Sequence, residues 1–174
     1  MKTYILIVIL IIAAGIIAGC SKKEETAFPP LKNEEISGER LWERIFTESP
    51  YERYAFWPGH EDVQLGQAPH GIFHRIYTNK DLVSSLPRAD KKAPYGSIIV
   101  KENLNSEKEL VKITVMAKVE GVDPDNGDWF WAVYTPEGKE EASGSLRGCI
   151  GCHEGMAEND YVIVQRLDAA LPDE

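Results

Sequence analysis

The chain has 174 residues, which suits one domain with extensions and is too short for two full domains. It carries 28 acidic against 19 basic residues, with a formal net charge of −9 at pH 7. This balance argues against a nucleic-acid partner, because phosphate binding requires clustered lysine and arginine side chains.

The first 20 residues have the pattern of an export signal. Lys2 gives a positive start, residues 5–17 form an apolar run, and Ala18-Gly19-Cys20 closes it with small residues. Such an ending resembles the bacterial lipoprotein box, in which the cysteine is diacylated and becomes the first residue. We predict a signal peptide at residues 1–19 and lipidation of Cys20, which anchors a periplasmic protein to the outer (or inner) membrane. The alternative is an uncleaved signal anchor, which also keeps the domain outside the cytoplasm.

The next segment has the composition of a flexible tether. Residues 20–37 are rich in Lys, Glu and Pro and offer little to bury, so we place the folded domain at residues 38–174. The domain opens with a helical pattern from Ser37 to Tyr54, in which Leu41, Trp42, Ile45 and Phe46 form one apolar face.

β-branched and aromatic runs dominate the middle of the chain. They predict strands at Gly71–Thr78, Ser97–Lys101, Lys112–Val119 and Trp129–Thr135, with a short helix at Asp81–Leu86. The turn-forming residues 123–128 join the last two strands into a hairpin, and they lack the ligand pattern of a calcium loop. The sequence therefore predicts an α+β fold with an antiparallel sheet of four or five strands and helices near both ends.

The sequence Cys149-Ile150-Gly151-Cys152-His153 carries the chemistry. Its spacing allows two thiols to bond the two vinyl groups of one haem edge, while His153 ligates the iron. A disulfide or a zinc site is the alternative, but zinc needs two more soft ligands and the sequence has no second cysteine pair. Because c-type haem is attached outside the cytoplasmic membrane, the export signal favours haem. We predict one covalently attached haem c, and a redox partner such as another cytochrome.

No methionine is well placed to ligate the opposite face of the iron. Only 21 residues follow His153, and Met156 is too close to it in sequence. Met116 lies in a predicted strand, where core packing is the simpler interpretation. We therefore expect an open coordination site, which binds small molecules such as NO or CO.

The order of several short pieces resembles the cytochrome P-460 family, which includes cytochrome c′-beta. The pieces lie between residues 41 and 164: Ala68-Pro69-His70, Arg75 to Asn79, Gly96 to Glu102, Gly127-Asp128-Trp129, and Cys149 to His153 with Asp160-Tyr161-Val162. The resemblance implies a curved antiparallel β-sheet packed with a few helices, with haem against the sheet, and commonly a homodimer.

Lys101 is the residue that matches a lysine bonded to the haem ring in family members that oxidise hydroxylamine. Strand alternation places Ser97, Ile99 and Lys101 on one face and Ile98, Val100 and Glu102 on the other. Lys101 is therefore a candidate haem contact or crosslink. The alternative is a side chain that emerges into solvent.

Three further side chains are candidates for the haem pocket. His70 and His74 are four residues apart in a strand-like segment, so they share a face, and either can relay protons near neutral pH. Arg75 matches the strand arginine of the family and can pair with a haem propionate. The alternatives are packed or exposed histidines and a surface ion pair. The distal acid of the family has no clear match on this chain.

Three functions stay open at this point. The protein binds or senses a gas, as cytochrome c′-beta does, or it is an oxidoreductase acting on hydroxylamine or nitric oxide. The third possibility is electron transfer with a six-coordinate iron. The missing methionine favours the first two, and the sequence does not separate them.

Overall fold

The structure is a computed structural model that describes residues 29–171, so the predicted signal peptide and Cys20 lie outside the described residues. The helices are α1 (Gly38–Trp42), the π-helical segment η1 (Glu43–Glu48), η2 (Tyr51–Arg53), α2 (Lys80–Val83), η3 (Pro124–Asn126), α3 (Arg147–His153) and η4 (Glu154–Asn159). The strands are β1 (Ala55–Phe56), β2 (Gln64–Leu65), β3 (Phe73–Thr78), β4 (Ile98–Leu104), β5 (Leu110–Lys118), β6 (Trp129–Tyr134) and β7 (Glu140–Gly144). None of the helices in this part of the chain is long and apolar enough to cross a bilayer.

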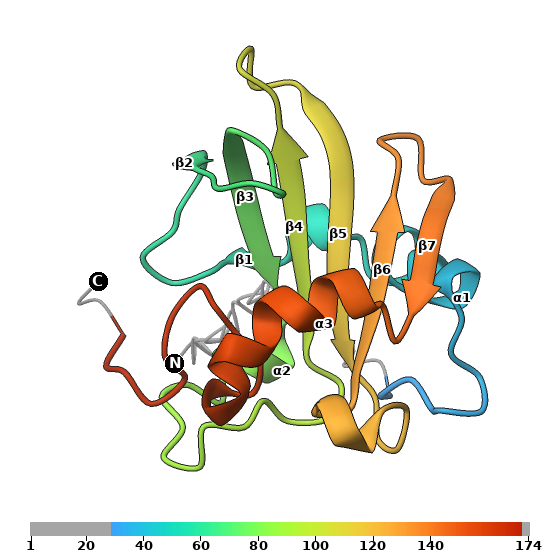
Figure 1. Cartoon of the computed structure of the whole chain (residues 1–174), viewed down its shortest axis with the longest axis vertical. Coiled ribbons are helices and arrows are strands. Elements are labelled where there is room, and N and C mark those ends of the chain that lie inside the picture. Colours follow the sequence, from blue (N-terminus) through green and yellow to red (C-terminus); the bar gives the residue numbers. More distant parts are fainter. Residues whose placement is uncertain (1–28, 172–174) are drawn as a thin grey trace, which may run out of the picture.

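Seven strands form one antiparallel sheet in the order β1-β3-β4-β5-β6-β7, with β2 also paired to β3 (Figure 1). Strands β3 to β6 are the four that the sequence predicts, and the α+β class is confirmed. The sheet is larger than predicted because β1 and β2 have only two residues each, which leaves no readable pattern. Strand β7 is a half-exposed edge strand of polar and small residues, so it shows no apolar alternation.

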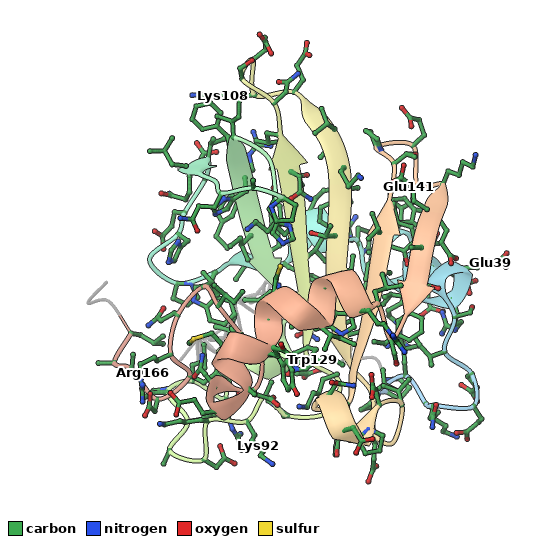
Figure 2. All side chains as sticks on the ribbon, in the orientation of Figure 1. Glu39, Lys92, Lys108, Trp129, Glu141 and Arg166 are labelled. Atoms are coloured by element: carbon green, nitrogen blue, oxygen red, sulfur yellow. The ribbon has the colours of Figure 1, made fainter. Side chains whose placement is uncertain are left out.

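Each face of the sheet has its own core. On one face, Leu41 from the N-terminal helices and Val100 from β4 belong to one core. On the opposite face, α3 crosses in front of the strands, and its Ile150 belongs to a second core with Ile99 (Figure 1). Figure 2 shows Trp129, a member of this second core, near α3, while Lys108 of the β4–β5 turn reaches over the Phe73 ring. Because Val100 belongs to the first core and Ile99 to the second, the predicted alternation along β4 is confirmed.

Helix α1 begins where the sequence predicts it. The Ser37 hydroxyl accepts a hydrogen bond from the Arg40 amide at 3.1 Å, as an N-cap does. Ahead of it, Leu31 is buried in the core, and the Arg44 guanidinium donates to the Pro29 carbonyl at 2.8 Å. Residues 29–37 of the predicted tether thus pack against the domain.

Candidate haem site

Helix α3 places the reactive groups of the motif on one side. Cys149, Cys152 and His153 fall at positions i, i+3 and i+4, so they share a face of the helix. All three line a cavity of about 480 Å³ between α3 and the sheet. Both cysteines are free thiols in the structure, Cys149 partly buried and Cys152 exposed. Both thiols that would bond a haem therefore lie in the wall of the cavity.

His153 is oriented as a metal ligand. Its Nδ1 lies 2.7 Å from the Tyr161 carbonyl oxygen. Because a carbonyl only accepts, Nδ1 carries the proton, and the lone pair of Nε2 is left for a metal. Burial lowers the pKa of His153, which favours the neutral form. The Trp131 ring packs edge-on against the imidazole, with the ring centres 4.7 Å apart, and limits its rotation.

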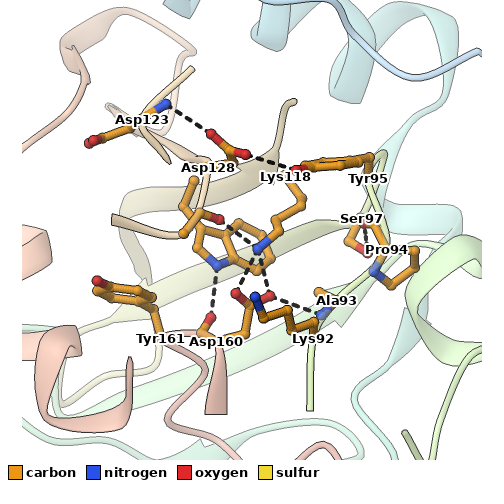
Figure 3. Close-up of polar contacts among 12 residues, drawn as sticks. Lys92, Ala93, Pro94, Tyr95, Ser97, Lys118, Asp123, Asp128, Asp160 and Tyr161 are labelled. Carbon is orange, nitrogen blue, oxygen red and sulfur yellow. Dashed lines mark hydrogen bonds and ion pairs between the residues drawn. The ribbon is translucent and has the colours of Figure 1, made fainter. Parts of the chain in front are cut away.

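A buried ion pair fixes the turn that presents the Tyr161 carbonyl (Figure 3). Lys118 Nζ donates to the two carboxylate oxygens of Asp160 at 2.6 and 2.7 Å, and the Ala93 amide donates to the same carboxylate at 2.9 Å. The Trp129 indole donates to the Asp160 carbonyl at 2.7 Å. Asp160 and Tyr161 have φ values of 54° and 65°, which non-glycine residues rarely adopt. The network thereby stabilises an unusual backbone turn directly behind His153.

The opposite side of the cavity holds the predicted distal residues. His70, His74 and Lys101 all line it, although His70 lies in the loop before β3 and not in a strand. The ring centre of His70 is 6.2 Å from that of His153. Nδ1 of His70 lies 3.2 Å from the Asn103 side-chain oxygen, whereas the buried Nδ1 of His74 has no hydrogen-bond partner among the described residues.

The electrostatics of the cavity favour neutral nitrogen bases. Burial, followed by the charge of Lys101, lowers the pKa of His70 and of His74 to about 4. Burial lowers the pKa of Lys101 from 10.5 to about 8. Within residues 29–171, the side chain of Lys101 makes no hydrogen bond or ion pair, and no carboxylate lines the cavity. The acidic residue that the family has in its distal pocket had no clear match in the sequence, and no Asp or Glu takes its place in this lining.

Arg75 points away from the cavity. Its guanidinium lies 2.9 Å from the Glu102 carboxylate and 3.4 Å from that of Asp62. Glu102 also accepts a hydrogen bond from the Tyr51 hydroxyl at 3.0 Å, on the face of the sheet covered by the N-terminal helices. Because neighbours alternate along β3, His74 faces the cavity and Arg75 does not. The predicted propionate contact is therefore corrected to an ion pair, the alternative that the sequence analysis left open.

The remaining walls are apolar and fit a flat macrocycle. Ile76, Ile99, Met116, Trp131 and Val162 line the cavity, and its volume lies within the range of about 300–1,000 Å³ found for cofactor pockets. Met116 also belongs to the core, as predicted. A second cavity of about 360 Å³ lies near α2 and the ends of β4 and β5, and it contains none of the predicted haem residues. Two thiols, one oriented imidazole and apolar walls thus make a site that fits haem.

The fold and site together define a sheet protein that presents a c-type haem motif to a cavity on one face of the sheet. The family model Cytochrome P460 matches residues 52–164. The chain therefore belongs to the cytochrome P460 family, as the resemblance predicted, and the family implies a c-type haem and chemistry on nitrogen species. A search of curated proteins finds no match. The number of haems and the thioether bonds stay predictions.

Proposed function

We propose that the protein is an exported, lipid-anchored monohaem cytochrome c that binds or redox-converts small nitrogen species such as nitric oxide and hydroxylamine. One observation carries the proposal: Cys149, Cys152 and His153 line one side of a cavity whose other side holds His70, His74 and Lys101. Membership of the cytochrome P460 family supports the haem and the nitrogen chemistry.

The residues of α3 hold the cofactor. Haem c, when bound, supplies an iron that takes small ligands and exchanges electrons. Cys149 and Cys152 would hold the macrocycle through thioether bonds, and His153 would ligate the iron through the lone pair of Nε2. The hydrogen bond from His153 Nδ1 to Tyr161 keeps the ring in one tautomer and increases its basicity. The proximal side is thereby fixed before any ligand arrives.

His74 and Lys101 act on the opposite side. The imidazole of His74 is neutral, because its pKa is about 4, and its unpartnered Nδ1 can accept or donate one hydrogen bond to a nitrogen ligand. With a pKa of about 8, Lys101 is a free amine in roughly one molecule in ten at neutral pH, against about one in three thousand for an ordinary lysine. Both groups therefore suit proton exchange with hydroxylamine.

The free amine of Lys101 is also what a bond to the haem ring requires. Such a bond replaces one N–H of Lys101 and one C–H of the macrocycle, so it removes two electrons and two protons and needs an oxidant such as a peroxide. Its support is the match of Lys101 to the crosslinking lysine of the family and its place in the cavity lining. We include this crosslink in the proposal.

The location and partners of the proposed cytochrome rest on the sequence. Ala18-Gly19-Cys20 favours a lipid anchor at the outer (or inner) membrane with the domain in the periplasm. The net charge of −9 favours a redox partner with a basic surface. Homodimer formation stays a proposal from the family resemblance.

Ligand titrations of the mature holoprotein test this function. We expect ferrous and ferric protein to bind nitric oxide in a saturable one-to-one reaction, and hydroxylamine to reduce the ferric protein or turn over with an artificial electron acceptor. Lys101→Met is expected to slow the hydroxylamine reaction while leaving nitric oxide binding intact. A holoprotein that exchanges electrons but responds to neither ligand is an electron-transfer cytochrome, and the proposal fails.

A further inference from the structure

The distance between His70 and His153 matches that of two imidazoles on one metal ion. Their ring centres are 6.2 Å apart, and the ring planes are nearly perpendicular at 86°. A metal–imidazole bond is about 2 Å long and the nitrogen lies about 1 Å from the ring centre, so two imidazoles on opposite sides of one metal ion have ring centres about 6 Å apart. Within the cavity, the two rings are therefore spaced to share one iron.

The tautomer of His70 is also that of a metal ligand. Asn103 donates with its side-chain amide to the Lys101 and Lys112 carbonyls and the Thr114 hydroxyl at 3.1–3.3 Å. Its oxygen is therefore the atom left to face His70, and it accepts from Nδ1 at 3.2 Å. Nδ1 of His70 carries the proton and Nε2 is free, the same arrangement that the Tyr161 carbonyl imposes on His153. His74 has no such partner.

We propose that His70 is a second axial ligand in the resting protein, bound through Nε2 on the side of the iron opposite His153, and that a small nitrogen ligand enters by displacing it. The inference rests on the haem-binding part of the proposed function. It replaces the expectation of an open coordination site, because a histidine takes the place that no methionine can fill.

The two histidines are held unequally, which decides which one leaves. His153 lies on α3, between the Trp131 ring and the Tyr161 carbonyl. His70 lies in a loop, where its amide donates to the Gln67 carbonyl at 2.8 Å, and within residues 29–171 Asn103 is the only hydrogen-bond partner of its ring. Releasing the ring from one neutral hydrogen bond costs about 1 kcal/mol, and β3 need not move. His70 is therefore the displaceable ligand.

Displacement has a measurable effect on affinity. Suppose that a ligand binds only the form in which His70 has left the iron. Its apparent affinity is then the intrinsic affinity multiplied by the fraction of protein in that form. If this form is on the order of 1 % of the protein, removal of His70 tightens ligand binding on the order of 100-fold. The rate of carbon monoxide binding should also reach a plateau at high gas concentration, because His70 must leave first.

Electronic absorption and electron paramagnetic resonance of the full-length holoprotein provide the test. We expect low-spin ferric and ferrous iron in the wild type and high-spin iron in His70→Ala, with added imidazole restoring the low-spin state. His74→Ala and His60→Ala remove the other two histidines that line the cavity, and both should stay low-spin. In His70→Ala the plateau should vanish, so that the carbon monoxide rate rises linearly with concentration.

Two results overturn the inference: a high-spin wild type with haem attached, or a His70→Ala protein that stays low-spin, which points to Met116 or Lys101 as the ligand. His70→Met serves if the alanine variant does not fold, and it should stay low-spin with a raised reduction potential. An unchanged reduction potential in His70→Met would also contradict the inference that His70 ligates the iron. Failure of the proposed function looks different, since His70→Ala would be high-spin and still show no response to nitric oxide or hydroxylamine.

Discussion

Replacement of Asp160 by asparagine tests the support behind the haem ligand His153. The substitution keeps the shape of the side chain and removes its charge, which leaves the Lys118 ammonium without its counter-ion. The side chains of Lys118 and Asp160 are only 6% and 4% exposed, so water cannot replace the lost partner. Asparagine keeps only one acceptor oxygen, so its NH2 group places a donor against either the Ala93 amide or the Lys118 ammonium, both of which donate to Asp160 in the wild type. Removing one member of a buried ion pair costs about 3–5 kcal/mol, and we expect a loss in this range.

Urea unfolding of the holoprotein at neutral pH measures this loss as a change in the free energy of unfolding. The control variant is Glu141→Gln, because Glu141 pairs with Lys112 at 3.2 Å and both side chains are nearly half exposed. Removing this surface pair should cost less than about 1 kcal/mol. If Asp160→Asn loses no more stability than Glu141→Gln, the buried pair does not hold the turn at Tyr161, and our account of the proximal support is wrong.

Three further predictions concern other parts of the molecule. Glu48→Gln should cost about 1 kcal/mol at neutral pH, because its two arginine partners hold the pKa of Glu48 below 4.5 despite the opposing effect of burial. That difference should disappear in urea titrations as the pH falls through the lowered pKa, and a difference that persists in acid contradicts an ionic cause. Proteolysis of the wild-type holoprotein should release a haem joined to two peptides, one of which contains Lys101, and Lys101→Met should release a single haem peptide; a single peptide from the wild type rules out the crosslink. Arg75→Leu should lower stability by about 1–3 kcal/mol, because it leaves the buried Glu102 without its ion pair, and should leave the reduction potential unchanged; a shifted potential without loss of stability would point back to a propionate contact.

The parts of the fold that the sequence predicts are those with strong local patterns. Strands β3 to β6 carry β-branched and aromatic residues because both of their faces are covered, so each shows a recognisable run. The cap at Ser37 is equally local. The haem motif needs only the spacing of five residues, from Cys149 to His153. These features were predicted because neighbours in sequence determine them.

The missed features depend on contacts between distant segments. Lys118 and Asp160 are 42 residues apart, and nothing in either local sequence indicates a buried pair. Arg75 matches a family position, but strand alternation puts it on the face of the sheet opposite His74, where it pairs with Glu102. The role inferred for His70 depends on Asn103 and His153, which lie on a different strand and on a helix. Only the folded chain brings these residues together.

The most direct test of the account is the mass of the mature protein and of its haem peptide, after expression of the full chain with a cytochrome c maturation system. We predict one haem increment, located on the peptide from Cys149 to His153, together with a Soret band. Cys152→Ala should leave at most one thioether bond, and Cys149→Ala with Cys152→Ala should leave none. Correctly exported wild-type protein without a Soret band and without the haem increment would contradict the central claim.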